Sequence, residues 1–181
     1  MNKIYDKIRN KAILDSEIIR EMEDLVFDIN FECDRDNWPL LMCVVRWGRK
    51  ELVEYLLLIP DINVYSWNDT ALHVCKDVSI LRLLLNRKDL DVNILSGFEQ
   101  TGLHCACWWR LKTCAKEYLL DARVDIRVID WHGNTARGIA LREKCPDIAK
   151  IINNSRYTTL LRIPNEALCR DIVRMIIEEY V

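Results

Sequence analysis

Apolar residues recur along the chain in groups that match the period of an α-helix. Two such groups are Leu52, Val53, Leu56 and Leu57, and Ile80, Leu81, Leu84 and Leu85. A spacing of i, i+1, i+4 and i+5 brings four side chains onto one face of a helix. The pattern therefore predicts short helices, whose apolar stripes must be buried against other parts of the protein.

The helical pattern repeats at a nearly constant interval. Four segments align with one another, and their equivalent helix-start residues are Trp38, Thr70, Thr101 and Thr135. By subtraction of these numbers, successive starts are 32, 31 and 34 residues apart. An interval of this size is typical of repeat proteins built from stacked helical hairpins, because a single hairpin cannot bury its own stripe. The three threonines are suited to cap helices, since a hydroxyl accepts a hydrogen bond from a free backbone N–H group.

Two short motifs recur in register within this pattern. Residues 70–73 read Thr-Ala-Leu-His and residues 101–104 read Thr-Gly-Leu-His, while residues 61–64, 90–93 and 124–127 share an acidic residue followed by a β-branched one. The first motif resembles the Thr-Pro-Leu-His signature of the ankyrin family, and the second resembles its Ala-Asp-Val-Asn step. We therefore identify the chain as a member of that family by resemblance.

The resemblance covers about residues 33–153. It implies an all-α fold, an ankyrin-repeat solenoid of stacked helix-turn-helix units with short β-hairpin turns. Gly133 stands where the family places its hairpin glycine, a residue that tolerates positive φ. The second repeat is about three residues short between His73 and Ile80, so we expect its first helix to be clipped.

The segments that flank the four aligned repeats also have helical patterns. Residues 4–14 and 16–27 read as two amphipathic helices, and Asp28-Ile-Asn echoes the second motif. We therefore expect residues 1–32 to form a degenerate N-terminal capping repeat. The four ankyrin repeats then occupy residues 33–153, and a helical tail occupies residues 154–181.

The tail allows three interpretations. Its Leu168-Cys169-Arg170 sequence, followed by Val173 and Arg174, resembles the start of a SOCS box. That resemblance implies that Leu168, Cys169 and Val173 dock on elongin C. The Ile163-Pro164-Asn165-Glu166 opening resembles an F-box-like tail, which implies Skp1 as the partner. In the third interpretation the tail only caps the last repeat, because docking and capping use the same apolar stripe.

Composition narrows the class of protein. The chain has 181 residues, half of them apolar, and a formal net charge of -2. This charge argues against a broad nucleic-acid surface, which needs cations to displace phosphate counterions. The N-terminus has no signal-peptide pattern, and no apolar run has the length of a membrane span. We expect a monomer without membrane or nucleic-acid partners, in the cytoplasm or the nucleus, whose eight cysteines are mostly reduced packing thiols.

Tryptophan and arginine are the candidate partner-binding residues. Trp is common at binding hot spots because it buries a large area and keeps one polar donor, and Arg is also enriched there. By the family resemblance these residues face the concave groove, where ankyrin proteins contact their partners. The alternative is that some of the rings pack locally. The candidates are Trp38, Arg46, Trp47, Trp67, Trp108, Trp109, Arg110 and Trp131.

Catalytic and metal chemistry is not indicated by the sequence. The His104-Cys105-Ala106-Cys107 run has two cysteines at a spacing that points them to different sides of a helix, unlike a zinc site. His73 and His104 are expected to make structural hydrogen bonds instead. With no phosphate-binding glycine loop and no catalytic constellation, we expect neither an enzyme nor a cofactor.

Two functions remain open. The first is a protein-interaction module that binds a partner protein through its groove and, through its tail, serves as a substrate-recognition adaptor of a cullin-type ubiquitin ligase. The second is a stand-alone inhibitor, similar to IκB-like or viral ankyrin proteins, that masks another protein and uses its tail only as a cap. The burial of the tail's apolar residues would distinguish the two.

Overall fold

The computed structural model describes residues 2–24, 28–32, 38–66 and 69–161, with the backbone alone for residues 2–3 and 156–161. This part of the chain is all-α. It contains ten α-helices, and its extended pairing consists of isolated antiparallel β-bridges between Glu32 and Pro39, Tyr65 and Thr70, and Ile129 and Thr135.

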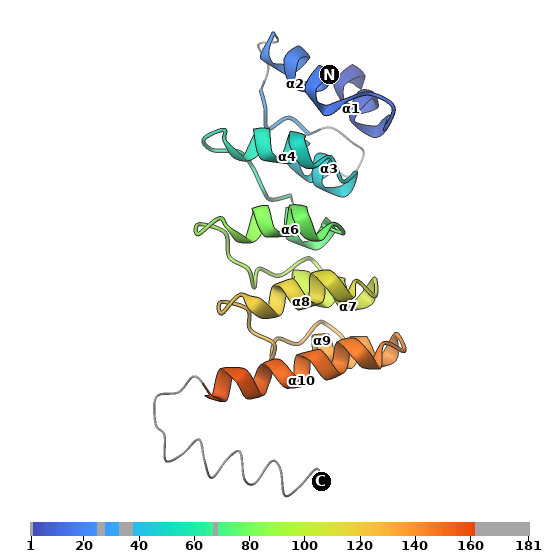
Figure 1. Ribbon diagram of the computed structural model, residues 1–181, viewed down its shortest axis with the longest axis vertical. Helices are drawn as coiled ribbons and strands as arrows, with labels where there is room; N and C mark the ends of the chain where they lie inside the picture. The colour runs from blue at the N-terminus through green and yellow to red at the C-terminus, as the bar shows by residue number, and fades with distance from the viewer. Residues whose placement is uncertain (1, 25–27, 33–37, 67–68, 162–181) are drawn as a thin grey trace, which may run out of the picture.

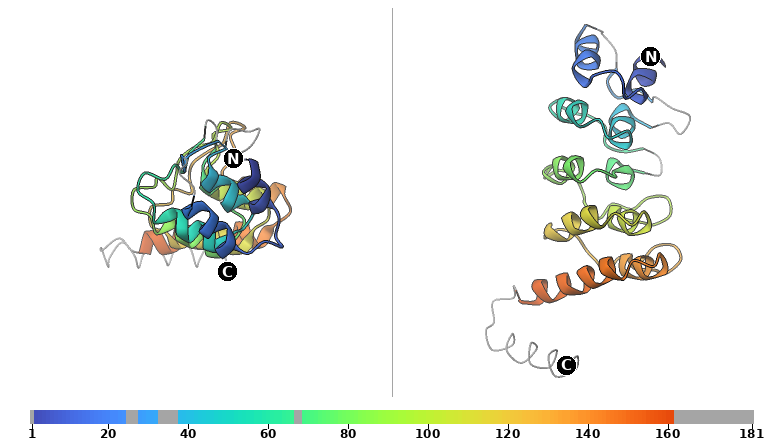
Figure 2. Two further views of the ribbon diagram at one scale, coloured as in Figure 1. Left: turned by 90° about the horizontal axis from the view of Figure 1, so that it is seen from above. Right: turned by 45° about the vertical axis from the view of Figure 1, so that its right-hand side comes forward.

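The described helices form five layers of two helices each, stacked along one axis (Figure 1). The odd-numbered helices contact one another in one column and the even-numbered helices in a second column (Figure 2). The layers are α1 (Asn2–Arg9) with α2 (Asp15–Glu23), α3 (Leu40–Arg46) with α4 (Lys50–Leu57), α5 (Ala71–Val74) with α6 (Val78–Leu85), α7 (Gly102–Trp108) with α8 (Lys112–Leu120), and α9 (Ala136–Arg142) with α10 (Pro146–Leu161).

The predicted apolar stripes lie in a core that all five layers share. In α4, Leu52, Val53 and Leu56 are buried, and in α6 the same holds for Ile80, Leu81 and Leu84. The cluster of buried residues extends from Ile4 in the first layer to Ile152 in the last. Each layer thus buries its stripe against its neighbours, as the sequence pattern predicted.

The helix starts confirm the capping prediction at Thr70 and Thr135. Thr70 Oγ1 accepts a hydrogen bond from Leu72 N at 3.2 Å, and Thr135 Oγ1 accepts one from Gly138 N at 3.3 Å. At Thr101 the side chain contacts Nδ1 of His104 at 2.8 Å, and that nitrogen accepts a hydrogen bond from Thr101 N at 3.2 Å. The predicted clipping of the second repeat is also confirmed, since α5 has four residues whereas α7 has seven.

The terminal helices differ in length from the prediction. α1 ends at Arg9 instead of continuing to Leu14, because Asn10 turns the chain and its Oδ1 accepts a hydrogen bond from Ala12 N at 3.1 Å. α2 ends at Glu23. At the other end of the chain, α10 continues to Leu161 and so crosses residue 153, where the sequence pattern changes.

The second sequence motif forms the same turn after several layers. Its acidic side chain accepts a hydrogen bond from the backbone N–H two residues on, at 2.9 Å each for Asp28, Asp91 and Asp125. The asparagine two residues after the acidic residue then contacts the next layer. Asn30 Oδ1 accepts a hydrogen bond from Asn63 N at 2.7 Å, and Asn93 Oδ1 accepts one from Asp125 N at 2.7 Å. The motif therefore sets the register between layers.

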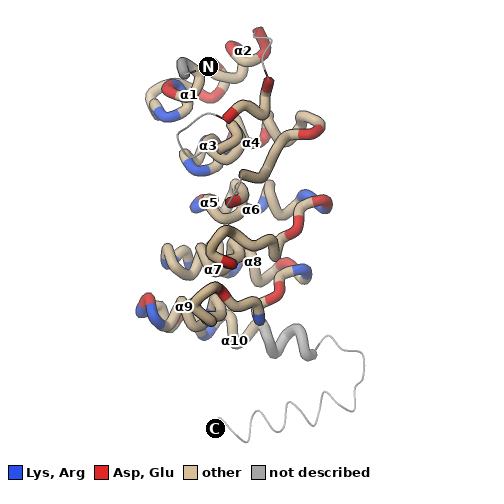
Figure 3. The backbone as a smooth tube through the Cα atoms, turned by 180° about the vertical axis from the view of Figure 1, so that it is seen from behind, with Lys and Arg blue, Asp and Glu red and all other residues tan. Residues whose placement is uncertain are grey.

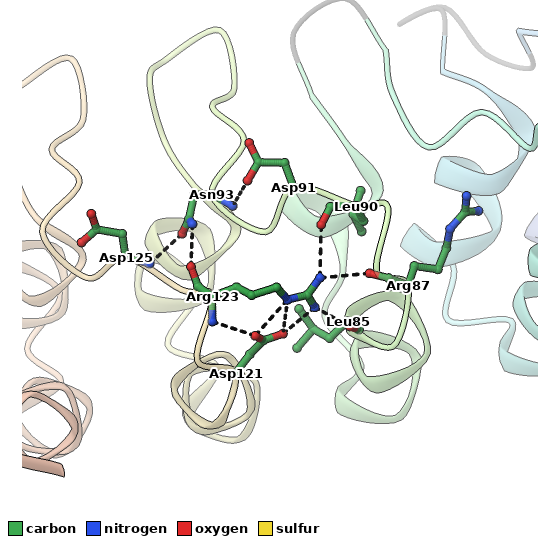
Figure 4. Close-up of polar contacts among 8 residues, drawn as sticks. All are labelled: Leu85, Arg87, Leu90, Asp91, Asn93, Asp121, Arg123 and Asp125. Atoms are coloured by element: carbon green, nitrogen blue, oxygen red, sulfur yellow. Dashed lines mark hydrogen bonds and ion pairs between the residues drawn. The ribbon is translucent and has the colours of Figure 1, made fainter. Parts of the chain in front are cut away.

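Arg123 makes the densest polar contact between layers (Figure 4). Its guanidinium donates hydrogen bonds to three backbone oxygens at and beyond the end of α6, on Leu85 at 2.5 Å, Arg87 at 3.1 Å and Leu90 at 3.4 Å. Asp121 accepts from the same group and holds it in place. A cation at the carboxyl end of a helix satisfies carbonyls that the helix leaves free.

Tyr118 joins three helices. It lies fully buried in α8 and donates a hydrogen bond from its hydroxyl to the backbone oxygen of Leu72 at 3.0 Å. The ring passes beside Gly102, where an added Cβ atom would stand 2.2 Å from the hydroxyl oxygen. Glycine at this position is therefore required by the tyrosine and not by backbone torsion.

The five cysteines Cys75, Cys105, Cys107, Cys114 and Cys145 are free and packed in the interior or partly so, as expected. Cys43 is disulfide-bonded, so the expectation of reduced thiols is wrong at that residue. None of the described helices is long and apolar enough to cross a membrane.

Candidate protein-binding surface

Each layer has two distinct ends. At one end a short turn joins the two helices of the layer, and we call the row of these turns the turn edge; it consists of segments 9–15, 46–50, 74–78, 108–112 and 142–146. At the other end a longer connection leads from the even-numbered helix to the next layer. We call the row of these connections the loop edge; its described parts lie between residues 58 and 70, 86 and 101, and 121 and 135.

Hydrogen bonds close each described connection into a narrow finger. Ser66 N donates to Asp69 O at 2.8 Å, Ser96 N to Gln100 O at 2.8 Å, and Asp130 N to Asn134 O at 2.9 Å. The carboxylate of Asp130 also accepts hydrogen bonds from the backbone N–H groups of His132 and Asn134, and these bonds lower its pKa although burial raises it. In the two connections that are described throughout, 86–101 and 121–135, these bonds hold the tips of the fingers in defined positions.

Large apolar side chains are exposed at these tips. Phe98 is 64% exposed and Trp131 is 68% exposed, and the two fingers are joined directly because Trp131 N donates a hydrogen bond to Phe98 O at 3.2 Å. The Trp131 ring stacks on His132 with ring centroids 6.3 Å apart. We call the exposed apolar residues of the loop edge the tip patch; they are Tyr65, Leu95, Phe98, Ile129 and Trp131.

Sequence reasoning found one member of the tip patch, Trp131. Tyr65, Leu95, Phe98 and Ile129 were not predicted, because they follow no helical period and are neither Trp nor Arg. A usable signal was present, since apolar residues stand inside turn segments such as Leu95-Ser-Gly-Phe98 that are otherwise small and polar.

The other described tryptophans lie against cations of this chain, along the odd-numbered helices. Arg142 stands over the ring of Trp108 with Cζ 5.0 Å from the ring centroid, and Lys76 stands over Trp109 with Nζ at 4.3 Å. Trp108 remains 48% exposed, whereas Trp109 is partly buried. Arg110, in the same turn, is exposed and forms an ion pair with Glu143 at 3.4 Å.

The tryptophans of the second layer are partly buried against the core. Trp38 precedes α3, and Arg46 at the far end of α3 lies over its ring at 5.3 Å. Trp47 follows α3, with Arg9 of the first layer over its ring at 5.8 Å. Part of the surface of each of these two rings is therefore buried by local packing, which was the alternative interpretation. The described tryptophans thus fall into two groups. One group has a cation over each ring and consists of Trp38, Trp47, Trp108 and Trp109, and the other is Trp131 at the finger tip.

Four of the predicted site residues lie outside the described part of the chain. These residues are Trp67, Leu168, Cys169 and Val173. The groove contact predicted for the tryptophans and arginines, and the docking role predicted for the tail, both remain predictions.

The titratable side chains of the interior are packed among apolar residues, and burial shifts their pKa values. Burial raises the pKa of Cys105 and of Cys107 to about 12, and it also raises the pKa of Cys114, so these thiols stay protonated and weakly nucleophilic at neutral pH. The pKa of His73 is lowered, chiefly by burial. The part of the chain that the structure describes contains no group of three His, Cys, Asp or Glu residues arranged to hold a metal ion.

The sequence matches none of the known protein-family models against which it was compared.

Proposed function

We propose that the chain is an ankyrin-repeat protein of five stacked units that binds another protein and catalyses no reaction. The two recurring motifs and the 31- to 34-residue interval between the helix starts support this assignment. So do the paired helices, the threonine caps and the turn that Asp28, Asp91 and Asp125 each form. Residues 1–32 serve as the N-terminal capping repeat, residues 33–153 as the four ankyrin repeats, and residues 154–181 as the tail.

The observation that carries the proposal is the tip patch. Phe98, Ile129 and Trp131 are each more than half exposed, on adjacent fingers held by backbone hydrogen bonds. Large apolar side chains gathered on rigid loops lose little conformational freedom on binding, so their burial by a partner gives a net gain in affinity. The partner protein is expected to cover this patch.

The same surface serves both functions that the sequence leaves open. An adaptor of a cullin-type ubiquitin ligase would hold its substrate there and recruit elongin C or Skp1 through the tail. A stand-alone inhibitor would use the surface to mask its target.

The experiment is a quantitative affinity purification from cell lysate with wild-type protein and a Phe98→Ala/Trp131→Ala variant. Both residues are exposed, so their removal changes the free energy of unfolding by less than about 1 kcal/mol. We expect the variant to recover at least tenfold less of the main partner than wild type does. The matched control is Leu58→Ala/Leu120→Ala, which removes two leucines that are 82% and 76% exposed at the ends of α4 and α8.

The proposal is wrong if the Phe98→Ala/Trp131→Ala variant recovers the same proteins in the same amounts as wild type. A Cys169→Asp variant in the same experiment separates the two functions. Elongin C or Skp1 recovered by wild type, and lost in this variant, supports the adaptor. If neither protein is recovered by wild type, the inhibitor is supported.

A further inference from the structure

The turn edge concentrates positive charge in an acidic protein. Its five segments contain ten Lys and Arg residues and three Asp and Glu residues, a formal net charge of +7, whereas the whole chain has a net charge of -2. The rest of the chain therefore has a net charge of -9. Figure 3 shows Lys and Arg recurring along one side of the stack from α1 to α9, which is the side of these turns. Segments far apart in the sequence thus place cations along one side of the stack, and we call this row of cations the strip. Carboxylates beside the strip pair with some of them: Lys50 with Glu54 at 3.3 Å, Arg110 with Glu143 at 3.4 Å, and Lys112 with Asp147 at 2.7 Å.

Nine of the ten cations are exposed to solvent. The exception is Arg49, which is buried and forms an ion pair with Asp15 at 2.8 Å while donating a hydrogen bond to Ile13 O at 2.6 Å. That cation joins the first two layers. The exposed ones are Arg9, Lys11, Arg46, Lys50, Lys76, Arg110, Lys112, Arg142 and Lys144.

Tryptophan rings hold several of these cations in place. Each of the four cation–π contacts in the described part of the chain involves a cation of the turn edge, and three of them join neighbouring layers, such as Lys76 over Trp109 and Arg142 over Trp108. A cation already held against a ring loses less side-chain entropy when it binds an anion. The strip is therefore partly preorganised.

Two of the cations occupy a backbone conformation that favours glycine. The equivalent turn position is Gly48 in the second layer, with φ of 69°, but it is Arg110 in the fourth layer and Lys144 in the fifth, with φ of 60° and 58°. In all three turns the next residue donates its N–H to the carbonyl five residues back, the usual end of a helix that terminates in glycine. A side chain with positive φ strains the backbone, and such strain is often found at functional sites.

We propose that the turn edge is a second binding surface, separate from the tip patch, and that it binds an extended acidic segment of a polypeptide. Stacked helices lie about 8–10 Å apart, and an extended chain of the polyproline II type advances about 3.1 Å per residue with three residues per turn. One layer therefore corresponds to about three residues of such a segment. Glu or Asp at every third position would meet a cation of each successive layer.

Two observations favour a polypeptide over a nucleic acid. Single-stranded nucleic acids bind by stacking bases on open aromatic rings, but Trp47, Trp108 and Trp109 each have a cation of this chain over the ring. In addition, the net charge of -9 outside the strip would repel a polyanion that extends beyond it. A short acidic segment remains within the strip.

The test measures binding of a fluorescent peptide of about fifteen residues with Glu at every third position, by anisotropy at low and physiological salt. The same peptide with Gln in place of Glu and an oligothymidylate of equal length are the competing probes. We expect the Glu peptide to bind more tightly than either, and its affinity to fall as salt rises.

The main variant is Arg110→Gly/Lys144→Gly. It relieves the left-handed strain, so we expect Tm to rise by about 2 °C while affinity for the Glu peptide falls about three- to tenfold. A second variant, Lys76→Gln/Arg142→Gln, removes two cations that lie on rings, and the same loss of affinity is expected there. The matched control, Lys88→Ser/Arg127→Ser, removes two exposed cations from the loop edge and should bind like wild type.

Equal binding of the Glu and Gln peptides would overturn the proposal. So would full affinity in both turn-edge variants, or an equal loss in the Lys88→Ser/Arg127→Ser control. Tighter binding of the oligothymidylate than of the Glu peptide would show that the strip binds nucleic acid instead. A Trp131→Ala variant should leave peptide binding unchanged, because the tip patch is a different surface.

Discussion

His73 joins two layers through both nitrogens of its ring. Nδ1 accepts a hydrogen bond from Thr70 N at 3.1 Å, so Nε2 carries the proton and donates to Gln100 O at 2.7 Å. His104 repeats the first contact with Thr101, but its buried Nε2 lies near the backbone of Asn134 without a hydrogen bond of good geometry. Protonation of Nδ1 would remove the acceptor on which each helix cap depends.

We expect stability to fall as pH falls below about 6.5. Burial lowers the pKa of His73 and of His104, so in this range the unfolded chain binds protons more readily than the folded protein. The stabilisation is complete above the unfolded pKa of about 6.5, and it is lost as pH falls from there to the folded pKa. Each imidazole contributes up to about 1.4 kcal/mol per pH unit in that window. Urea unfolding at a series of pH values between 7.5 and 5 measures this change in the free energy of unfolding.

The chain supplies its own control for this prediction. His132 is exposed at a finger tip, so His132→Gln should keep the pH profile of wild type. His73→Gln and His104→Gln should be less stable at pH 7.5 but should lose less on acidification. Hydrogen bonds from Ser79 and from Arg123 lower the pKa of Asp77 and of Asp121, so these two carboxylates titrate below the pH range of the experiment. An identical slope in all four proteins would contradict the assignment.

Between elements, polar contacts to helix ends decide how one layer is held on the next. α6 ends in carbonyls that need partners, and the described contacts supply them from Arg123, which belongs to the connection after α8. The contact is directional, because the guanidinium is already oriented by Asp121. It therefore fixes the position of one element relative to another, which apolar packing alone does less sharply.

We expect Arg123→Ala to lower the free energy of unfolding by about 1–2 kcal/mol, a figure reduced for the partial exposure of the side chain. Hydrogen exchange should increase most at the end of α6 and in the connection after it. Arg127→Ala is the matched control, because Arg127 pairs with Asp125 alone among the described contacts and both side chains are exposed. That variant should unfold with a free energy close to that of wild type. Similar losses in both variants would refute the structural role of Arg123.

At the scale of the whole molecule, stability depends on position along the stack. The helices of a layer contact those of adjacent layers, so an end layer has one neighbour and an inner layer has two. Loss of an end layer exposes one interface, whereas loss of an inner layer disconnects the molecule.

This arrangement predicts different outcomes for two similar core substitutions. Leu84→Ala in α6 and Ile8→Ala in α1 each remove a fully buried side chain and should cost about 2–5 kcal/mol locally. Leu84→Ala should lower Tm for the whole molecule, while Ile8→Ala should increase hydrogen exchange mainly in α1 and α2. Exchange followed by mass spectrometry distinguishes them. Uniform acceleration in the Ile8→Ala variant would show that the five layers unfold as one unit.

Much of the fold follows from local rules that the sequence displays directly. The threonine caps, the Asp28, Asp91 and Asp125 turns and the Leu-rich stripes are each satisfied within a few residues, so their patterns predicted the helix starts and the period of the layers. Helix ends were less predictable, as at Asn10, because a turn and a further helical turn differ little in local energy. The requirement for Gly102 could not be predicted either, since it depends on Tyr118 of another helix.

The candidate surfaces were decided mainly by tertiary structure. The sequence by itself predicted the repeating helical hairpins and proposed Trp131 as a binding candidate, because both inferences rest on short segments. Only stacking placed Phe98 beside Trp131, and only stacking collected ten cations from five separate turns into one strip. The physical reason is that charge and exposed apolar area act through distances in space. Residues about 33 positions apart along the chain become neighbours only once the layers pack.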